Sequence, residues 1–214
     1  MTRPSRFVLF ASSLLLAGWA VTPAATAAAA APAATDRAQA ESQKLNAIFD
    51  EYFEEYLQQN PILATSIGDP RYNDRFVVGI SPAAMAAEET LHRDYLARLQ
   101  AVDRAVLPAA DQLSYDIFRT GREREIEGFK FPDELIPLNQ FYSTPNSFAQ
   151  LGSGNGMQPF KTVQDYDNFL KRLDGFVAWT DQAIVNMKQG VQRGYTLPKV
   201  LAERTLPQLE AHIV

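Results

Sequence analysis

Few residues of this sequence could hold a metal ion. It contains two histidines, His92 and His212, and no cysteine. A zinc site takes three or four protein ligands, and no H-E-x-x-H pair is present to supply two of them from one helix. His92 falls on the polar side of its helical pattern, so we expect a surface or partly buried side chain, and His212 lies in the last helical segment. The sequence therefore predicts no metal ligand and no zinc or other cofactor within this segment.

The chain also lacks the usual surroundings of a catalytic serine. Ser153 lies in the Gly-Ser-Gly-Asn-Gly stretch of residues 152–156, which is not a G-x-S-x-G nucleophile elbow and follows no strand pattern. The same glycines lack the Gly-Lys-Ser/Thr ending of a phosphate-binding loop. We therefore interpret this stretch as a flexible turn and assign no catalytic and no cofactor-binding residue.

Carboxylates are concentrated in two groups, one in the first predicted helix and one in the loop that follows. A paired-carboxylate site needs two such groups in a cleft, with pKa values held apart. The first group falls opposite an apolar stripe and is expected to face water. The second lacks the D-x-D-x-D-G spacing of a calcium loop and is expected to cap helices and brace the loop. The groups are Asp50, Glu51, Glu54 and Glu55, and Asp69, Asn73 and Asp74.

A series of amphipathic helices must position all of these residues. The first carries apolar side chains, Tyr52 and Tyr56 among them, at helical spacing from Leu45 to Leu57, and this stripe needs burial against later helices. Pro207 is expected to kink or divide the last helix. The charge run at 119–127 is expected to be a solvated helix face. We expect helices at residues 45–59, 61–67, 82–105, 108–128, 162–194 and from 198 onward.

Residues 129–160 break the helical pattern with four prolines and a glycine-rich stretch. We interpret them as one long irregular segment with a short helix around Ser147–Leu151. Irregular segments of this length in compact domains are often functional, so this one is the expected place for ligand contacts. Because no stretch alternates apolar and polar residues as a strand does, the predicted fold class is all-α.

The N-terminus has the features of a cleaved secretory signal. Arg3 and Arg6 precede an apolar run and a small-residue tract with an Ala-x-Ala site ending at Ala27. The run is shorter than the ~20 apolar residues of a membrane span, so no stable span is expected after cleavage. The sequence thus predicts an exported protein, periplasmic or extracellular. Its expected parts are a signal peptide at 1–27, a flexible linker at 28–40 and a helical domain at 41–214 that is truncated at its C-terminal end.

The amino-acid composition limits the classes of partner that this protein is expected to bind. Cleavage after Ala27 leaves 18 basic against 25 acidic residues, so the net charge becomes −7 in place of −5. A surface of this charge disfavours nucleic acid and anionic membranes. The absence of cysteine excludes disulfides, so stability must come from a packed core. Composition does not determine the oligomeric state.

Several short motifs resemble one bacterial family when their order and spacing are taken together. The resemblance is to the exported family known as domain of unknown function 885, and it covers residues 43–209. Its motifs are Phe53–Leu57, Asn60-Pro61 with Thr65, Gly68-Asp69, Arg71–Arg75, Leu113–Phe118, Pro137–Gln140, Pro159–Tyr166 and Gly194–Leu209.

This resemblance implies a protein of several hundred residues with a large helical, neurolysin-like fold. The later part of such proteins carries an H-E-x-x-P-G-H-type motif, similar to zinc metallopeptidases of the neurolysin and carboxypeptidase kind. There the histidines and a downstream glutamate would hold zinc, and the motif glutamate would act as general base. This sequence contains none of those positions, so no catalytic or metal residue is carried over to it.

We therefore expect the N-terminal helical segment of an exported, zinc-dependent peptidase-like hydrolase, inactive by itself and without the catalytic motif. The full-length protein would bind zinc and a small peptide-like substrate. The main alternative is a non-catalytic periplasmic helical binding or scaffold module, and a lipid- or cell-wall-associated enzyme is a third option.

Overall fold

The computed structural model describes residues 27–213, with side chains from residue 34 onward. Every regular element in that part of the chain is a helix, so the predicted all-α class is confirmed. The signal-peptide prediction falls on residues 1–27, nearly all of them outside the described residues. The α-helices are α1 (Ala27–Gln59), α2 (Pro61–Ser66), α3 (Pro82–Gln100), α4 (Ala109–Gly128), α5 (Thr144–Leu151), α6 (Val163–Arg193) and α7 (Lys199–Glu210), and the 3-10 helices are η1 (Pro70–Tyr72), η2 (Arg104–Val106) and η3 (Asp133–Leu135).

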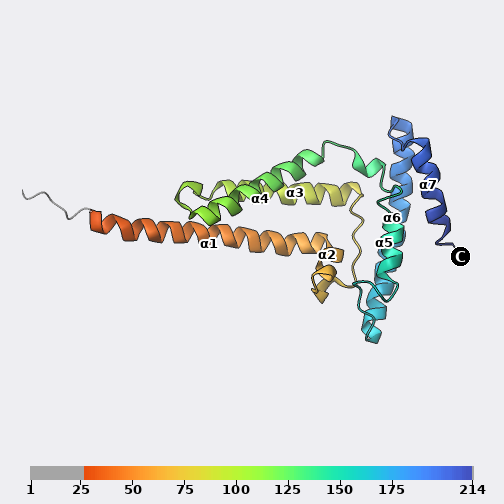
Figure 1. The fold of residues 1–214 in the computed structure, drawn as a ribbon, viewed down its shortest axis with the longest axis horizontal. Helices are drawn as coiled ribbons and strands as arrows, with labels where there is room; N and C mark the ends of the chain where they lie inside the picture. The colour runs from red at the N-terminus through yellow and green to blue at the C-terminus, as the bar shows by residue number, and fades with distance from the viewer. Residues whose placement is uncertain (1–26, 214) are drawn as a thin grey trace, which may run out of the picture.

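Helices α1, α3 and α4 form a long three-helix arm (Figure 1). Their facing sides share one core, in which the Tyr52 ring lies edge-on to the rings of Tyr95 and Phe118, with centroids 5.3 and 5.0 Å apart. Leu45 and Leu99 are at most 1% exposed. Most of the predicted stripe of α1 is therefore buried, although Phe53 stays 45% exposed, and removing this surface from water is the main force holding the arm together.

The beginning of α1 differs from the sequence expectation. Residues 28–40, assigned above to a flexible linker, continue α1. Alanine has the highest helix propensity, and this tract is rich in it. The helix is also attached to η2, because Arg37 pairs with Asp103 at 2.6 Å and the buried Glu41 accepts a 2.9 Å hydrogen bond from the Asp103 amide.

Helix α6 crosses the end of the arm and carries α5 and α7 beside it (Figure 1). Thr162 and Asp165 form the predicted capping box at its first turn. Further along α6, Gly175 permits close packing against Phe76. A Cβ at this position would lie 2.7 Å from Phe76 Cβ and 2.8 Å from Phe76 O. The Phe148 ring of α5 stacks on Phe176 of α6, with centroids 4.3 Å apart.

The irregular segment at 129–160 is short of regular structure, as predicted, but it is well attached. Its expected short helix is α5, which begins at Thr144 because Ser143 accepts a hydrogen bond from the Asn146 amide. The buried Leu135 of η3 packs beside α6. This segment therefore connects the arm to the α6 layer.

Two further features of the helices differ from the sequence expectation. Helix α3 ends at Gln100, five residues before the expected Ala105. Helix α7 passes through Pro207 without being divided, because the missing amide removes one hydrogen bond near the helix end and the Pro207 carbonyl still accepts from the Ala211 amide at 3.1 Å. None of the helices within residues 27–213 combines the length and apolar character needed to cross a membrane.

A single arginine attaches α6 to the start of the chain. Arg172 of α6 has no exposed surface. Its Nη2 donates to the Pro61 and Tyr72 carbonyl oxygens at 3.2 and 3.0 Å and to Thr65 Oγ1 at 2.5 Å. Its Nε donates to the Arg75 carbonyl oxygen at 3.0 Å.

The last donor of Arg172, Nη1, bonds the Gln158 side-chain oxygen. Burial lowers the pKa of the Arg172 guanidinium to about 10, so it stays charged at neutral pH. Within the described residues no carboxylate lies within ion-pair distance of this cation, so neutral oxygens alone replace its hydration shell.

We predict that Arg172→Met lowers the free energy of unfolding by about 3 kcal/mol or more, because several buried oxygens lose their donor at once. Chemical denaturation measures the change. The control is Arg93→Met, which removes an exposed α3 pair with Glu89 and should change stability by less than about 0.5 kcal/mol. Equal losses in the two variants would contradict the role given to Arg172.

Candidate functional site

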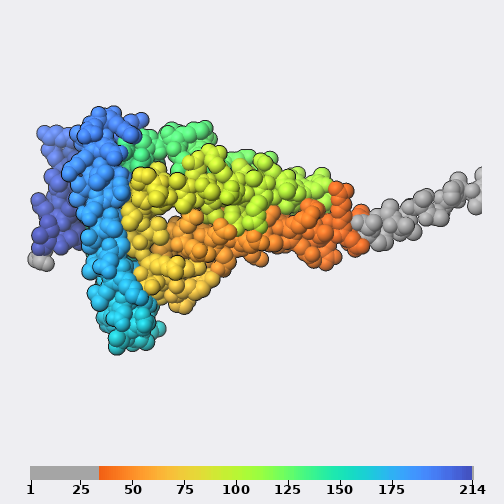
Figure 2. All heavy atoms as spheres, turned by 180° about the vertical axis from the view of Figure 1, so that it is seen from behind, coloured from red at the N-terminus to blue at the C-terminus, as the bar shows by residue number. Residues whose placement is uncertain are grey.

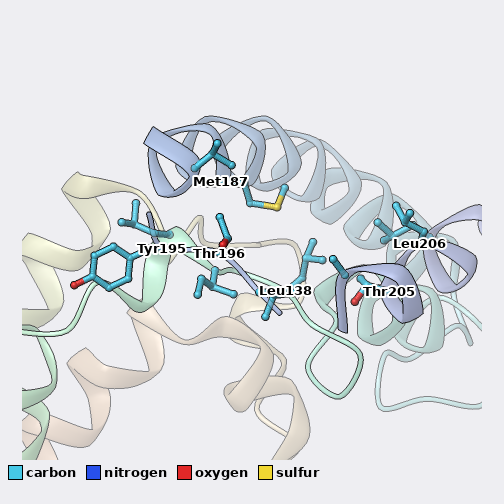
Figure 3. Close-up of a pocket in the computed structure, with 12 residues that line it drawn as sticks. Leu138, Met187, Tyr195, Thr196, Thr205 and Leu206 are labelled. Atoms are coloured by element: carbon cyan, nitrogen blue, oxygen red, sulfur yellow. The ribbon is translucent and has the colours of Figure 1, made fainter. Parts of the chain in front are cut away.

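An apolar pocket of about 420 Å³ lies between α6, α7 and the segment around η3. Figure 3 shows Met187 of α6 above Leu138 and Thr196, with Leu206 of α7 at one end and Tyr195 at the other. Hydroxyl groups are the only polar side-chain groups among its lining residues, and none of those residues is charged. The lining residues are Leu135, Ile136, Leu138, Met187, Val191, Tyr195, Thr196, Leu197, Ala202, Thr205, Leu206 and Leu209.

Two glycines at the end of α6 shape this pocket. Gly194 has φ 77° and is the predicted left-handed helix terminator; it reverses the chain so that 195–197 forms one wall. Gly190 allows two other segments to approach α6, because a Cβ there would lie 2.7 Å from the Tyr195 carbonyl oxygen and 2.9 Å from that of Leu135. The pocket therefore depends on backbone contacts that only glycine permits.

A second, acidic hollow of about 390 Å³ lies where the arm meets the irregular segment. Glu88 of α3 and Glu125 of α4 line it together with Asp133 and Glu134. Burial, and then the negative charge of Glu125, raise the pKa of the Glu88 carboxyl. These carboxylates make the hollow suited to a positive charge rather than to an anion.

His92 lies behind this hollow and is only 1% exposed, so the expectation of a surface or partly buried side chain is wrong. The α3 face that carries it looks polar in sequence but packs against Tyr52, Tyr56 and Phe129, with ring centroids 6.1, 6.5 and 6.2 Å away. Its Nδ1 is buried with no hydrogen-bond partner. Burial, assisted by the positive charge of Arg122, lowers the pKa of the His92 imidazole to about 4, so the ring is neutral near pH 7.

Arg122 is the exception to the solvated face expected at 119–127. Its guanidinium carbon lies 4.2 Å from the Tyr52 ring centroid and 5.0 Å from that of Phe118, a cation–π arrangement inside the arm. Burial raises the pKa of the Tyr52 and Tyr56 phenols. Tyr52 is a core residue, as the sequence predicts, and Tyr56 is partly buried against the same core.

The described residues do not fit a zinc ion. Within 34–213 no three His, Asp or Glu side chains are grouped so that they could hold a metal. His92 Nε2 and Glu88 Oε1 lie 3.9 Å apart, which brings two possible ligands together and no third. His212 lies just after α7 and contacts Asn146 Oδ1 through Nε2 at 2.6 Å. No chemistry through zinc can be derived from these side chains.

The two predicted carboxylate groups act as braces. On α1, Glu51 pairs with Arg98 at 2.5 Å and Glu55 accepts from the Tyr95 hydroxyl at 2.8 Å, while all four carboxylates stay exposed. In the loop, Asp69 caps η1 by accepting from the Arg71 amide, and Asp74 lies 3.6 Å from Lys171 of α6.

The glycine-rich stretch is a tight turn. Gly154 has φ 79°, and a Cβ at Gly152 would lie 2.5 Å from the Phe169 ring. Ser153 donates to the Gln150 carbonyl oxygen at 2.7 Å, so its hydroxyl serves the turn. The glycine-rich turn and the two carboxylate groups therefore have structural roles in the described chain. The α6–α7 pocket was not predicted from the sequence. The apolar positions from Val191 to Leu209 were the one signal for it.

Comparison with known proteins gives one match. Residues 61–214 match the model of a family described as "Bacterial protein of unknown function (DUF885)". No curated protein and no solved structure matches the chain. Three residues of the motifs that carried the resemblance, Pro61, Thr65 and Tyr72, provide oxygens that accept from Arg172. Part of the motif set that carries the family resemblance therefore consists of residues that attach α6 to α2 and η1.

We predict that Gly190→Ala destabilises the protein by about 1–3 kcal/mol, because the added methyl meets two carbonyl oxygens. Thermal denaturation measures the change. Gly121→Ala is the matched control: a Cβ there has open space within α4, and the variant should gain about 0.5–1 kcal/mol. If Gly190→Ala left the stability unchanged, the segments that approach α6 at Gly190 could move apart without cost, which would contradict the prediction.

We predict that His92 makes the protein less stable in acid. An unfolded histidine titrates near pH ~6.5, whereas the folded ring stays neutral down to about 4, so the unfolded chain binds more protons between these values. Stability attributable to His92 should fall by about 3 kcal/mol as the pH drops from 6.5 to 4. Denaturation across this range should show a shallower acid loss for His92→Gln.

Glu88→Gln provides the control for this pH series. The raised pKa of Glu88 acts in the opposite direction, since the folded carboxyl keeps its proton to a higher pH. The loss of stability in acid should therefore be as large in Glu88→Gln as in the unmodified protein, or larger. Parallel curves for the protein and His92→Gln would show that His92 has no such role.

Proposed function

The chain belongs to the bacterial protein family of unknown function DUF885, and from this premise we propose that it is the N-terminal helical segment of an exported, zinc-dependent, peptidase-like hydrolase. In this proposal the segment binds substrate and carries no catalytic group. The α6–α7 pocket receives an apolar side chain of a peptide-like substrate. Zinc and the general base belong to the motif that the family resemblance implies outside this sequence.

The pocket is the observation that carries the proposal. Its volume of about 420 Å³ falls within the ~300–1,000 Å³ usual for small-molecule sites. Apolar side chains line it, with the hydroxyls of Tyr195, Thr196 and Thr205 as polar groups, so it selects by shape and apolar area. A leucine or phenylalanine side chain is the part of a peptide that gains most from such surroundings.

The same pocket also favours the alternative of a non-catalytic periplasmic binding module. None of its lining residues is an acid, a base or a histidine, so it can hold an apolar group without reacting with it. The two proposals share the ligand chemistry and differ only in whether the protein hydrolyses it. Zinc content and hydrolysis therefore separate them.

The test uses the secreted protein expressed from its own gene. We expect bound zinc by elemental analysis, and hydrolysis of fluorogenic peptides that stops when a chelator is added. Residues 28–214 purified alone should hydrolyse nothing. A protein without zinc whose hydrolysis is indifferent to chelators would exclude the metallopeptidase. Peptide binding without any hydrolysis would assign the protein to the binding module.

Filling the pocket tests the substrate contact itself. Ala202 is exposed and lines the pocket, so Ala202→Trp should occupy it without disturbing the α7 backbone. We expect KM for peptides with leucine or phenylalanine to rise about tenfold while kcat changes little, because binding alone is lost. Arg204→Trp, at an exposed α7 position outside the pocket lining, is the control. Unchanged KM in Ala202→Trp would remove the pocket from substrate binding.

A further inference from the structure

One face of α6 carries apolar side chains that remain exposed along the whole helix. We call this set the α6 stripe. Its members follow one another at alternating steps of three and four residues, the spacing of a coiled-coil seam, with only Thr180 polar in the series. Thr180 and Met187 are half-buried. The other members of the stripe are between 41% and 79% exposed. The stripe consists of Val163, Tyr166, Leu170, Leu173, Val177, Thr180, Ile184, Met187 and Val191.

Apart from Met187 and Val191, which also line the α6–α7 pocket, the stripe is separate from the face that α6 packs against the arm and α5. That inner face has the same spacing and includes the buried Arg172, Trp179 and Ala183. The stripe runs for about 42 Å, at ~1.5 Å per residue. Figure 2 shows α6 uncovered along the outside of the molecule. Exposed apolar surface of this extent marks an interaction site.

A column of three aspartates flanks the stripe. Asp167, Asp174 and Asp181 each follow a stripe residue by four positions, which is the flanking position that pairs with a partner helix in a coiled coil. Lys188 holds the next position of this column, so three negative charges and one positive charge flank the stripe. All three are exposed, and none forms an ion pair within the described residues. The partner that complements this surface carries positive charge beside its apolar residues.

We propose that the α6 stripe binds an amphipathic helix of another polypeptide whose apolar heptad seam is flanked by lysine or arginine. The apolar seam packs into the stripe, and the basic flank pairs with Asp167, Asp174 and Asp181. The contact gives affinity through burial and selects its partner through charge.

A second copy of this chain complements the aspartate column less well than a helix with basic flanks. In antiparallel pairing of two α6 helices, Asp174 faces Asp181 of the second copy and Asp167 faces its Lys188, so only one of the three aspartates meets a positive charge. Parallel pairing requires the column that contains Phe169 and Phe176, which already stacks on Phe148. A helix with basic flanks pairs with all three aspartates, at the cost of one like-charge contact with Lys188, and it does not need the column that contains Phe169 and Phe176.

The experiment uses two synthetic 28-residue helices with leucine at the seam. One has lysine at every flanking position and the other has glutamate. Binding to the purified chain is followed by fluorescence anisotropy. We expect the lysine peptide to bind about tenfold more tightly, from three exposed charge pairs, and the difference to shrink in high salt.

Charge reversal gives the decisive comparison. A variant with Asp167→Lys, Asp174→Lys and Asp181→Lys should prefer the glutamate peptide, and this gain also shows that the variant is folded. Val177→Asp, at the centre of the stripe, should abolish binding of both peptides to an otherwise native protein. Gln189→Asp, exposed on α6 outside the stripe, should change nothing.

Three outcomes would overturn the proposal. The first is equal affinity of the chain for the two peptides, and the second is an unchanged preference after charge reversal. The third is sedimentation showing a dimer that Val177→Asp dissociates, which would assign the stripe to a second copy of the chain.

Discussion

The two layers of this protein depend on the burial of one positive charge. Arg172 has five acceptor atoms around it, provided by α2, η1, the chain after η1 and the segment before α6. A guanidinium without water is tolerated only if its N–H groups are satisfied, so these segments must all be in place together. These hydrogen bonds hold α6 against the arm. Because they are directional, they also determine the position at which α6 crosses it.

The arm is stabilised differently. Its core is a set of aromatic and aliphatic side chains that pack by area and shape, with Tyr52 at the centre. Such contacts tolerate small shifts, and the arm gains precision from the polar groups around it, such as the Arg122 guanidinium over Tyr52. His92 is the unusual member of this region, because a buried ring nitrogen without a partner opposes protonation and couples the packing of the arm to pH.

Helix α6 serves three surfaces at once. Its inner face holds Arg172 and the stacked phenylalanines, its C-terminal end forms one wall of the apolar pocket, and the α6 stripe faces outward. Met187 and Val191 belong to both the stripe and the pocket lining, so a helix bound to the stripe would lie next to whatever fills the pocket. The proposed substrate contact and the proposed partner contact therefore adjoin on one element.

Local signals in the sequence were enough to predict most of the helices and several of their boundaries. Proline and capping residues at Pro61, Ser81 and Thr162 act within a single turn, so the helix starts could be predicted, and so could the terminator Gly194. The all-α class follows from the same periodicity. The family resemblance was also readable from the sequence, since its motifs are ordered along the chain.

Tertiary structure alone decided the burial of individual polar residues and which apolar positions of α6 stay uncovered. Arg172 reads as a surface residue next to Lys171, and its burial depends on oxygens from residues about a hundred positions earlier. His92 looked partly exposed until α1 and α4 were placed against α3. The α6–α7 pocket and the α6 stripe use one apolar pattern that a sequence cannot divide between covered and uncovered faces. That division depends on contacts between segments far apart in the chain, whereas helix propensity and capping depend on neighbours.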